Sequence, residues 1–273
     1  MCIRDSDKSR NYFFTSESVS EGHPDKICDR ISDTILDAYL SLDKNSRVAV
    51  ETLVTTNLVV ISGEIRSTNK ISDSEIESLS RNAIKEIGYD FGDFNHENVK
   101  IMIHLHEQSP DIARGVDAVG DNSEGAGDQG IMFGYACNET KELMPATLSF
   151  SHKILKDLAY KRKNNIITGI LPDSKSQLTL FYENDKPKYI DSIVVSSQHK
   201  EETTQEYLHE EINRLCKRIL PDEWYTDDTK LLVNPTGKFV IGGPVGDTGL
   251  TGRKIICLLY TSDAADEEDS VDL

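Results

Sequence analysis

The feature that most constrains the fold of this chain is a repeated order of secondary-structure signals. Two stretches, roughly 120 residues apart, both read strand, helix, strand, strand, helix, strand. Strands interleaved with amphipathic helices predict mixed sheets packed against helices. The expected fold class is therefore α+β, built from repeated βαββαβ units, with a third copy that begins near residue 238 and is cut short.

The first copy begins with a short strand at residues 12–14, and Pro24 opens a helix that runs to residue 42. Two strands, 48–56 and 58–65, form a hairpin that turns at Asn57. A helix at 72–87 ends at Gly88, and a strand follows at 99–106. The apolar face of the first helix is expected to comprise Ile27, Ile31, Ile35, Ala38 and Leu42.

The second copy repeats this order further along the chain. It has a strand at 131–136, a helix at 145–162, a hairpin of strands 177–182 and 189–195, a helix at 201–220 and a closing strand at 231–233. The order is thus the same in both copies, which is why one architecture is expected for both.

Composition limits the function classes. The net charge of -17 and the lack of a basic stripe with interleaved aromatics argue against nucleic acid as a partner. No apolar run is long enough for a membrane span, and no signal-peptide pattern opens the chain. The five cysteines form no CxxC pair, which is typical of reduced thiols and indicates a cytoplasmic protein.

A glycine-rich stretch at residues 237–254 stands out against this acidic background. It holds six glycines in eighteen residues and ends in Arg253-Lys254. Backbone N–H groups freed by glycine, together with two cations, are suited to a polyphosphate. The alternative is a flexible surface loop.

The familiar phosphate-binding motifs are absent from the sequence. Residues 125–130 spell GxGxxG, but an acidic segment precedes them and a strand follows, which is the wrong context for a dinucleotide fold. The stretch 237–254 does not spell a Walker P-loop. These absences disfavour an ordinary phosphotransferase, and any phosphate site must use a less common arrangement.

Four carboxylates are candidates for ligand contact on the sequence alone. Asp25 lies in the first turn of a helix beside His23, whereas Asp33 and Asp37 on the same stripe read as a solvated acidic face. Glu51 and Glu64 interrupt apolar strands and would need a cation if they faced inward. Asp173 and Lys175 follow Pro172 at a loop-to-strand edge, with an ordinary surface turn as the alternative.

Four motifs together resemble the S-adenosylmethionine synthetase (methionine adenosyltransferase) family, in register from about residue 12 to residue 256. They are EGHPDK at 21–26, GAGDQG at 125–130, PDSKSQ at 172–177 and the segment from Gly242 to Lys254. The resemblance implies synthesis of S-adenosylmethionine from ATP and L-methionine, with release of phosphate and diphosphate. It also implies a threefold βαββαβ fold and a homodimer or tetramer whose active sites are shared between subunits.

The resemblance also implies roles for individual residues. His23, Lys175 and Arg253 would be catalytic. Asp25 would bind magnesium, of which the family uses two ions per site, and Glu51 would bind potassium. Residues 108–118 resemble the mobile gate of the family. The ATP-binding residues would be His23, Asp173, Lys175, Lys238, Phe239, Asp247, Arg253 and Lys254; the methionine-binding residues would be Glu64, Gln108 and Asp247; Asp128 would neighbour the adenosine site.

The sequence also departs from the family pattern. Leu171 stands where the family usually has arginine, and the lysines and second magnesium aspartate of a third repeat do not follow residue 256. We expect residues 1–11 and the acidic segment 257–273, which should be disordered, to be sequence foreign to a C-terminally truncated member. The expected domains are 12–120, with the gate loop, 121–236, and the opening of a third repeat at 237–256.

This truncation bears on activity. The chain is expected to turn over weakly or not at all, because residues that the family supplies from the third repeat are missing. The alternative hypothesis is a nucleotide-binding fragment that performs no catalysis.

Overall fold

The structure is a computed structural model that describes residues 11–108 and 134–254. Its elements divide into two compact units. The N-terminal unit comprises the described residues of 24–135 and 244–252, and the central unit comprises those of 1–23, 136–243 and 253–273. Each unit holds one four-stranded sheet and two helices, which confirms the α+β class.

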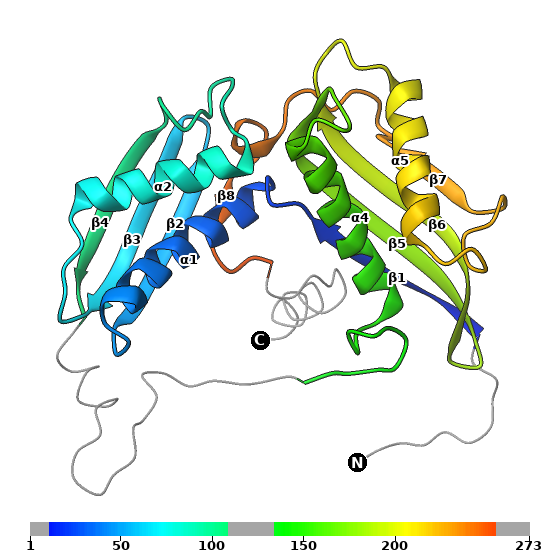
Figure 1. The fold of residues 1–273 in the computed structure, drawn as a ribbon, viewed down its shortest axis with the longest axis horizontal. Coiled ribbons are helices and arrows are strands. Elements are labelled where there is room, and N and C mark those ends of the chain that lie inside the picture. The colour runs from blue at the N-terminus through cyan, green and yellow to red at the C-terminus, as the bar shows by residue number, and fades with distance from the viewer. Residues whose placement is uncertain (1–10, 109–133, 255–273) are drawn as a thin grey trace, which may run out of the picture. The chain divides into compact units, whose positions relative to one another are not determined.

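The sheet of the N-terminal unit has the strand order β4-β3-β2-β8. The hairpin strands β2 (Arg47–Thr55) and β3 (Leu58–Arg66) are antiparallel, and β4 (Lys100–Glu107) lies parallel to β3. The short strand β8 (Gly249–Leu250) pairs with β2 from a distant part of the sequence. Helices α1 (Pro24–Leu42) and α2 (Asp73–Ile87) lie on the same face of the sheet (Figure 1).

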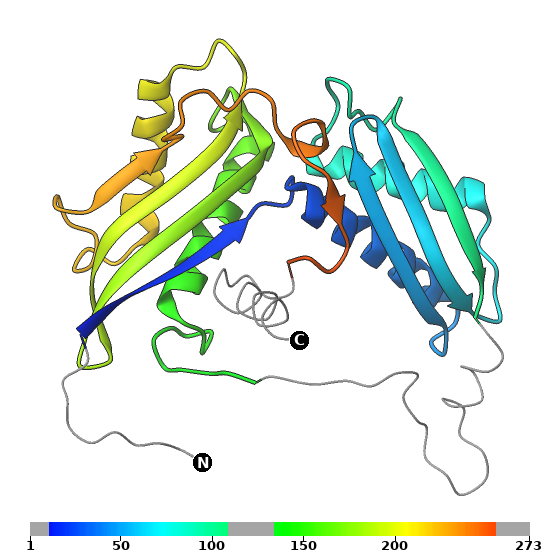
Figure 2. The same cartoon turned by 180° about the vertical axis from the view of Figure 1, so that it is seen from behind.

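The sheet of the central unit has the order β1-β5-β6-β7. The long hairpin strands β5 (Ile170–Glu183) and β6 (Lys186–His199) are antiparallel, and β7 (Lys230–Val233) lies parallel to β6. Strand β1 (Asn11–Val19) pairs with β5 along its whole length. Helices α4 (Ala146–Lys163) and α5 (Gln205–Ile219) cover one face, and Figure 2 shows the opposite face of the sheet.

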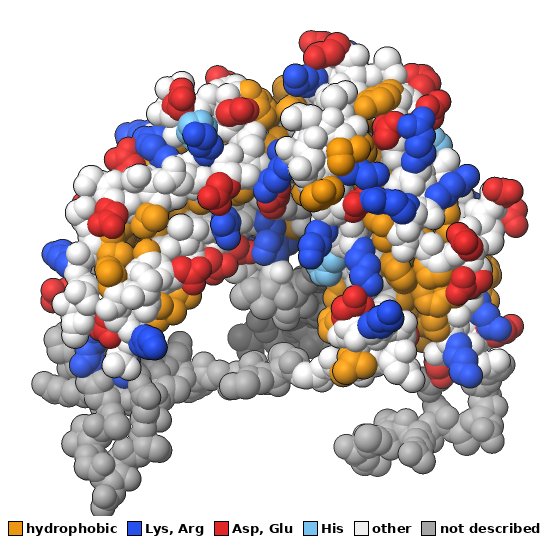
Figure 3. Space-filling model, in the orientation of Figure 1, with side chains coloured by type: hydrophobic (Ala, Val, Ile, Leu, Met, Phe, Trp, Pro, Cys, Tyr) orange, Lys and Arg blue, Asp and Glu red, His pale blue; other side chains and the backbone are white. Residues whose placement is uncertain are grey.

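Each core lies between a sheet and its helices. In the N-terminal unit Ile27, Ile31 and Ile35 of α1 are fully buried, as their spacing predicts, whereas Leu42 at the helix end is 55% exposed. Tyr39 takes the last core position of α1 instead, because it lies one turn after Ile35 on the same side of the helix. In each unit, charged side chains of both signs are interspersed over the helices (Figure 3).

The pairing of β1 was not anticipated from sequence order. Residues 11–19 precede α1 in the chain, yet they form the edge of the sheet built by β5, β6 and β7. Strand pairing depends on which edge is free rather than on which element is next in sequence. The compact units are therefore not continuous stretches of chain, unlike the ranges 12–120 and 121–236 expected from the repeat.

Two further expectations are affected by where the strands begin. The segment 172–175 was expected at a loop-to-strand edge, but it lies within β5, after a register irregularity between Ile170 and Ser174. Of the strand expected at 131–136, residues 131–133 lie outside the described residues, and residues 134–136 are not in a strand.

Candidate active site

Three segments that are far apart in sequence meet in the central unit. Ser20 lies just beyond β1, and its hydroxyl donates to the carbonyl oxygen of Pro172 at 2.7 Å and accepts from the N–H of Ser174 at 2.8 Å. The backbone N–H of His23 donates to the carbonyl of Ser20 at 3.0 Å. These bonds fix the segment 20–23 against residues 172–174 of β5.

The glycine-rich segment joins the same place. The N–H of Gly243 donates to Oδ2 of Asp173 at 2.8 Å, and Asp173 is only 4% exposed. A buried carboxylate that accepts backbone N–H groups is stabilised in its charged form. The central unit also holds the other predicted ATP residues except Asp247, namely Lys175, Lys238, Phe239, Arg253 and Lys254 beside His23 and Asp173.

Two glycines are required here by close approach. A Cβ added at Gly22 would lie 2.4 Å from Pro172, and one at Gly242 would lie 2.7 Å from the ring of Phe239. Any larger residue at either position would push the segments apart. The glycines of this stretch thus allow close contact between segments, a role that differs from simple loop flexibility.

The two predicted cations on these segments face solvent. Lys175 is exposed on β5 between the buried residues Ser174 and Ser176. Lys238 is exposed as well, with its Nζ 3.5 Å from Oε1 of Glu201. The exposed ion pair between Lys238 and Glu201 contributes little to stability, so the Lys238 amine can leave it for a ligand. The exposed amine of Lys175 can contact a ligand as well.

Asp25 lies in the N-terminal unit and is 2% exposed. Its Oδ1 accepts from the N–H of Leu250 in β8 at 2.9 Å, and Oδ1 of Asp29, one turn later, accepts from the N–H of Gly252 at 3.0 Å. Two aspartates of α1 thus anchor the end of the glycine-rich segment. Asp33 and Asp37 are exposed, in agreement with a solvated acidic face.

Glu51 and Glu64 do not face the core. Both belong to the residues of β2 and β3 that alternate with the buried set, so their side chains lie on the sheet face opposite the helices. Glu51 is exposed, and Oε1 of Glu64 lies 3.1 Å from Nε2 of His106 on the neighbouring strand. The sequence left their orientation open, and the pleat sends Val50 and Thr52 to the buried face.

The remaining predicted residues lie at the end of the glycine-rich segment and at the end of β4. Asp247 is exposed and accepts from the N–H of Thr248, and Arg253 is exposed while Lys254 is half-buried. The N–H of Gln108 donates to the carbonyl of Ile65 at 3.2 Å, at the end of β4. Asp128, residues 109–118 of the expected gate, and the segments 1–10 and 255–273 lie outside the described residues.

The carboxylates fit magnesium only in part. Among the described residues no group of three or more His, Cys, Asp or Glu side chains is placed to hold a metal ion. Magnesium often takes one or two protein carboxylates and completes its shell with water and substrate phosphates. Asp25 is suited to that limited role. Glu51 is a single exposed carboxylate on the sheet face opposite the helices.

Two domain models of one family match this chain. The S-adenosylmethionine synthetase N-terminal domain matches residues 11–110, and the S-adenosylmethionine synthetase central domain matches residues 123–239. The chain belongs to the S-adenosylmethionine synthetase family. The two matched ranges include all three segments that meet at Asp173, apart from the last residues of the glycine-rich stretch.

Individual relatives agree with the family match. The chain is 55% identical over 251 residues to S-adenosylmethionine synthase of Paramagnetospirillum magneticum, covering 92% of this chain and 65% of the relative. It is 54% identical over 250 residues to S-adenosylmethionine synthase of Maricaulis maris, covering 92% and 64%. The chain therefore spans slightly less than two thirds of the length of these synthetases.

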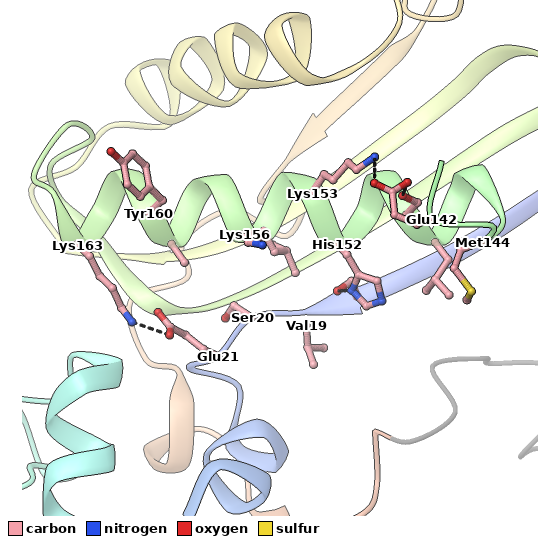
Figure 4. Close-up of a pocket in the computed structure, with 15 residues that line it drawn as sticks. Val19, Ser20, Glu21, Glu142, Met144, His152, Lys153, Lys156, Tyr160 and Lys163 are labelled. Carbon is pink, nitrogen blue, oxygen red and sulfur yellow. Dashed lines mark hydrogen bonds and ion pairs between the residues drawn. The ribbon is translucent and has the colours of Figure 1, made fainter. Parts of the chain in front are cut away.

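A cavity of about 690 Å³ lies along α4 and the end of β1 in the central unit, and Ser20 and Glu21 are among the residues that line it (Figure 4). Apolar side chains such as Leu148 and Leu155 line it, and ion pairs border it: Lys163 with Glu21 at 2.7 Å and Lys153 with Glu142 at 3.0 Å. The hydrogen bond from Lys153 lowers the pKa of Glu142. None of the residues expected to bind ATP or methionine lines this cavity.

Sequence reasoning missed the residues that support the synthetase site. Asn234, Gln198 and His199 are buried polar residues that hold the loop carrying Lys238 and Phe239. The dipeptide Asn234-Pro235 was an available turn signal. Nothing in the pattern of β6 distinguished Gln198 and His199 from the end of an ordinary strand.

Proposed function

We propose that this chain carries part of the machinery that makes S-adenosylmethionine from ATP and L-methionine, with release of phosphate and diphosphate. The observation that carries the proposal is the meeting of residues 20–23, 172–175 and 237–243 around the buried carboxylate of Asp173. This arrangement places one imidazole, two exposed amines and one aromatic ring of the predicted ATP set in one unit.

This reaction needs no nucleophilic side chain from the protein. The neutral sulfur of methionine attacks the 5′ carbon of the ribose, the carbon–oxygen bond breaks, and the triphosphate leaves with the bonding electrons before water cleaves it. Positioning and stabilisation of charge on the leaving chain then provide most of the catalysis. His23 would donate a hydrogen bond to the leaving oxygen, and Lys175 and Lys238 would contact the phosphates. Phe239 would pack against the nucleotide.

Metal ions would supplement these residues. Magnesium, when bound, would neutralise charge on the triphosphate, and Asp25 would be its protein carboxylate. The exposed carboxylate of Glu51 is the candidate for potassium. Glu64, Gln108 and Asp247 are the candidates for the amino and carboxyl groups of methionine, and Arg253 and Lys254 are further candidates for the phosphates.

The remaining features of the family are proposals for this chain as well. We infer a homodimer or tetramer with shared active sites, and a cytoplasmic location. Among the described residues no helix is both long and apolar enough to cross a membrane. Turnover by this chain alone would be weak or absent, because it spans about 65% of the length of its relatives.

Two measurements on the purified chain test the proposal. Equilibrium dialysis with ATP and magnesium measures nucleotide binding, and mass spectrometry after addition of methionine and potassium measures S-adenosylmethionine. We expect binding without robust turnover. A high rate of product formation would contradict the expected inactivity, whereas no binding at millimolar ATP would contradict the proposed site.

A variant pair makes the test specific. Lys175→Ala removes an exposed amine at the proposed site, and Lys186→Ala removes an exposed amine at the turn of the same hairpin. Neither change should alter folding, because both side chains face solvent. We expect only Lys175→Ala to weaken ATP binding, by about tenfold, which corresponds to one charge-assisted contact. Equal affinities in the two variants would rule out contact between Lys175 and the nucleotide.

A further inference from the structure

Asn234 occupies an unusual place at the end of β7. Its Oδ1 accepts from the N–H of Ser197 at 2.8 Å, and its Nδ2 donates to the carbonyl oxygen of Ser197 at 3.1 Å. The side-chain amide thereby makes the two hydrogen bonds that a further backbone rung between β7 and β6 would make. The last true rung pairs Val195 with Val233, and the N–H of Asn234 donates to the carbonyl of Val195.

Because the side chain of Asn234 makes these bonds to Ser197, the main chain can leave the sheet at this point. Asn234 has φ of 44°, in the left-handed region that asparagine tolerates better than most residues. Its carbonyl oxygen accepts from the N–H of Gly237 at 2.8 Å, which closes a turn. The chain therefore turns out of β7 at Asn234 while its side chain keeps β6 paired.

The turn leads directly to the proposed nucleotide residues. Beyond it, the N–H of His199 donates to the carbonyl of Phe239 at 2.9 Å, and Nε2 of Gln198 donates to the carbonyl of Val240 at 3.1 Å. Ser197, Gln198 and His199 are consecutive in β6, and each holds a part of the segment 234–240. Lys238 and Phe239 lie between the first attachment, at Asn234, and the last, at Val240.

We propose that Asn234 is a positioning residue for the nucleotide site, acting through the loop 235–240 and not by contact with ATP. The inference rests on the proposed function, since it assigns Lys238 and Phe239 to the nucleotide. Loss of the amide would leave the buried N–H of Ser197 without this partner, would remove one of the two contacts of its carbonyl, which also lies 3.1 Å from Nδ1 of His199, and would release the loop from its register. A displacement of about 1 Å in binding groups is enough to cost up to a hundredfold in function.

Two variants separate the side chain from the backbone conformation. Asn234→Ala removes the amide and disfavours the positive φ, whereas Asn234→Gly removes the amide and accepts that φ. The matched control is Thr147→Val, which deletes the buried 2.7 Å hydrogen bond to Ser16 elsewhere in the same unit. All three lose buried polar contacts, but only the first two touch the loop.

Hydrogen exchange reports on the loop without any ligand. We expect the amide of His199, which is bonded to the carbonyl of Phe239, to exchange at least tenfold faster in both Asn234 variants and at the wild-type rate in Thr147→Val. We expect all three variants to lose stability, because each loses a buried polar contact, and ATP binding to weaken at least tenfold in the Asn234 variants alone. A purely structural role would lower the stability of all three and leave their affinity unchanged.

The possible results separate the positioning role of Asn234 from the proposed nucleotide binding. Unchanged exchange at His199 in folded Asn234→Ala and Asn234→Gly would overturn the positioning role. Full ATP affinity in Asn234→Gly would overturn it as well, because only backbone conformation would then matter. If the wild-type chain binds no ATP while the exchange effect is present, the proposed function fails and Asn234 is left as an anchor of the loop.

Discussion

The two units of this protein are built to one plan and completed differently. Each has an antiparallel hairpin, a parallel third strand reached through a helix, and an antiparallel edge strand supplied by a distant part of the chain. In the central unit that edge strand, β1, has nine residues, whereas in the N-terminal unit it is β8, with two. The same strand arrangement is therefore compatible with an edge strand of nine residues or of two.

The shorter edge is reinforced by side chains. The hydroxyl of Thr251 accepts from the N–H of Thr52 at 2.7 Å and donates to the carbonyl of Thr52 at 3.1 Å, just beyond the last backbone pair of β8. Asn234 does the same for Ser197 where β7 ends in the central unit. Both units thus support the end of a short strand with a polar side chain, and at Thr251 the backbone N–H donates to the carbonyl of Thr52 as well, at 3.0 Å.

The largest expected loss of stability comes from core truncations, which test whether the two units unfold independently. Leu180→Ala in the central unit and Ile61→Ala in the N-terminal unit each empty a fully buried site, which should cost about 2–5 kcal/mol. The single tryptophan, Trp224, packs against the central core and reports on that unit. We expect its fluorescence transition in urea to shift with Leu180→Ala only. An equal shift with Ile61→Ala would show that the units unfold together.

A smaller effect is expected from the side-chain rung of the N-terminal unit. Thr251→Val keeps the shape but leaves the buried N–H of Thr52 unpaired, at a cost of about 1–3 kcal/mol. The control, Thr248→Val, removes an exposed hydroxyl bonded to Thr55 on the same segment. Hydrogen exchange at Thr52 should accelerate in the first variant alone. Protection that persists in Thr251→Val would mean that backbone pairing holds β8 unaided.

The equivalent helices α2 and α5 allow a matched pair of capping variants. Ser72 accepts from the N–H of Glu75 at 3.3 Å, and Thr204 accepts from the N–H of Tyr207 at 3.2 Å. Ser72→Ala and Thr204→Ala should each cost about 1 kcal/mol. Only Thr204→Ala should shift the Trp224 transition, while Ser78→Ala, within α2, should have almost no effect. A loss below a few tenths of a kcal/mol at either cap would show that tertiary packing defines that helix start.

The buried thiols should behave alike in both units and leave stability unchanged near neutral pH. Burial raises the pKa of Cys28 and of Cys216 from the ordinary 9.0 to about 12. Because the folded pKa exceeds the unfolded one, their contribution is complete below pH 9 and is lost as the pH rises toward 12. Peptide mass spectrometry after iodoacetamide at pH 8 should find Cys137 modified before either. Rapid labelling of only one buried thiol would reveal a unit that opens locally.

Much of the fold was accessible from sequence because it depends on local patterns. Helix α2 begins at Ser72 and ends at Gly88, whose φ of 109° is the left-handed cap expected of glycine. The turns at Asn57 and Asn184-Asp185 likewise adopt positive φ. Hydrophobic spacing identified Ile27, Ile31 and Ile35 as core. These signals act over a few residues, so no tertiary information was needed.

The site was only partly predictable for the opposite reason. The motifs at 21–26 and 172–177 were recognised, but the hydrogen bonds that join them through Ser20 are contacts across about 150 positions, on which local patterns carry no information. The orientation of Glu51 and Glu64 stayed open at the sequence level, since a strand that alternates can present either set of residues to its helices.

The sequence by itself determined the class of elements, their order, the repeat and the family resemblance, because periodicity, capping residues and long motifs are properties of neighbouring positions. Only the tertiary structure decided that β1 completes the central sheet, that β8 completes the N-terminal one, and that Asp173 and Asp25 anchor the glycine-rich segment. Strand edges and buried carboxylates take whichever partners the packed chain brings to them, and those partners lie far away in sequence.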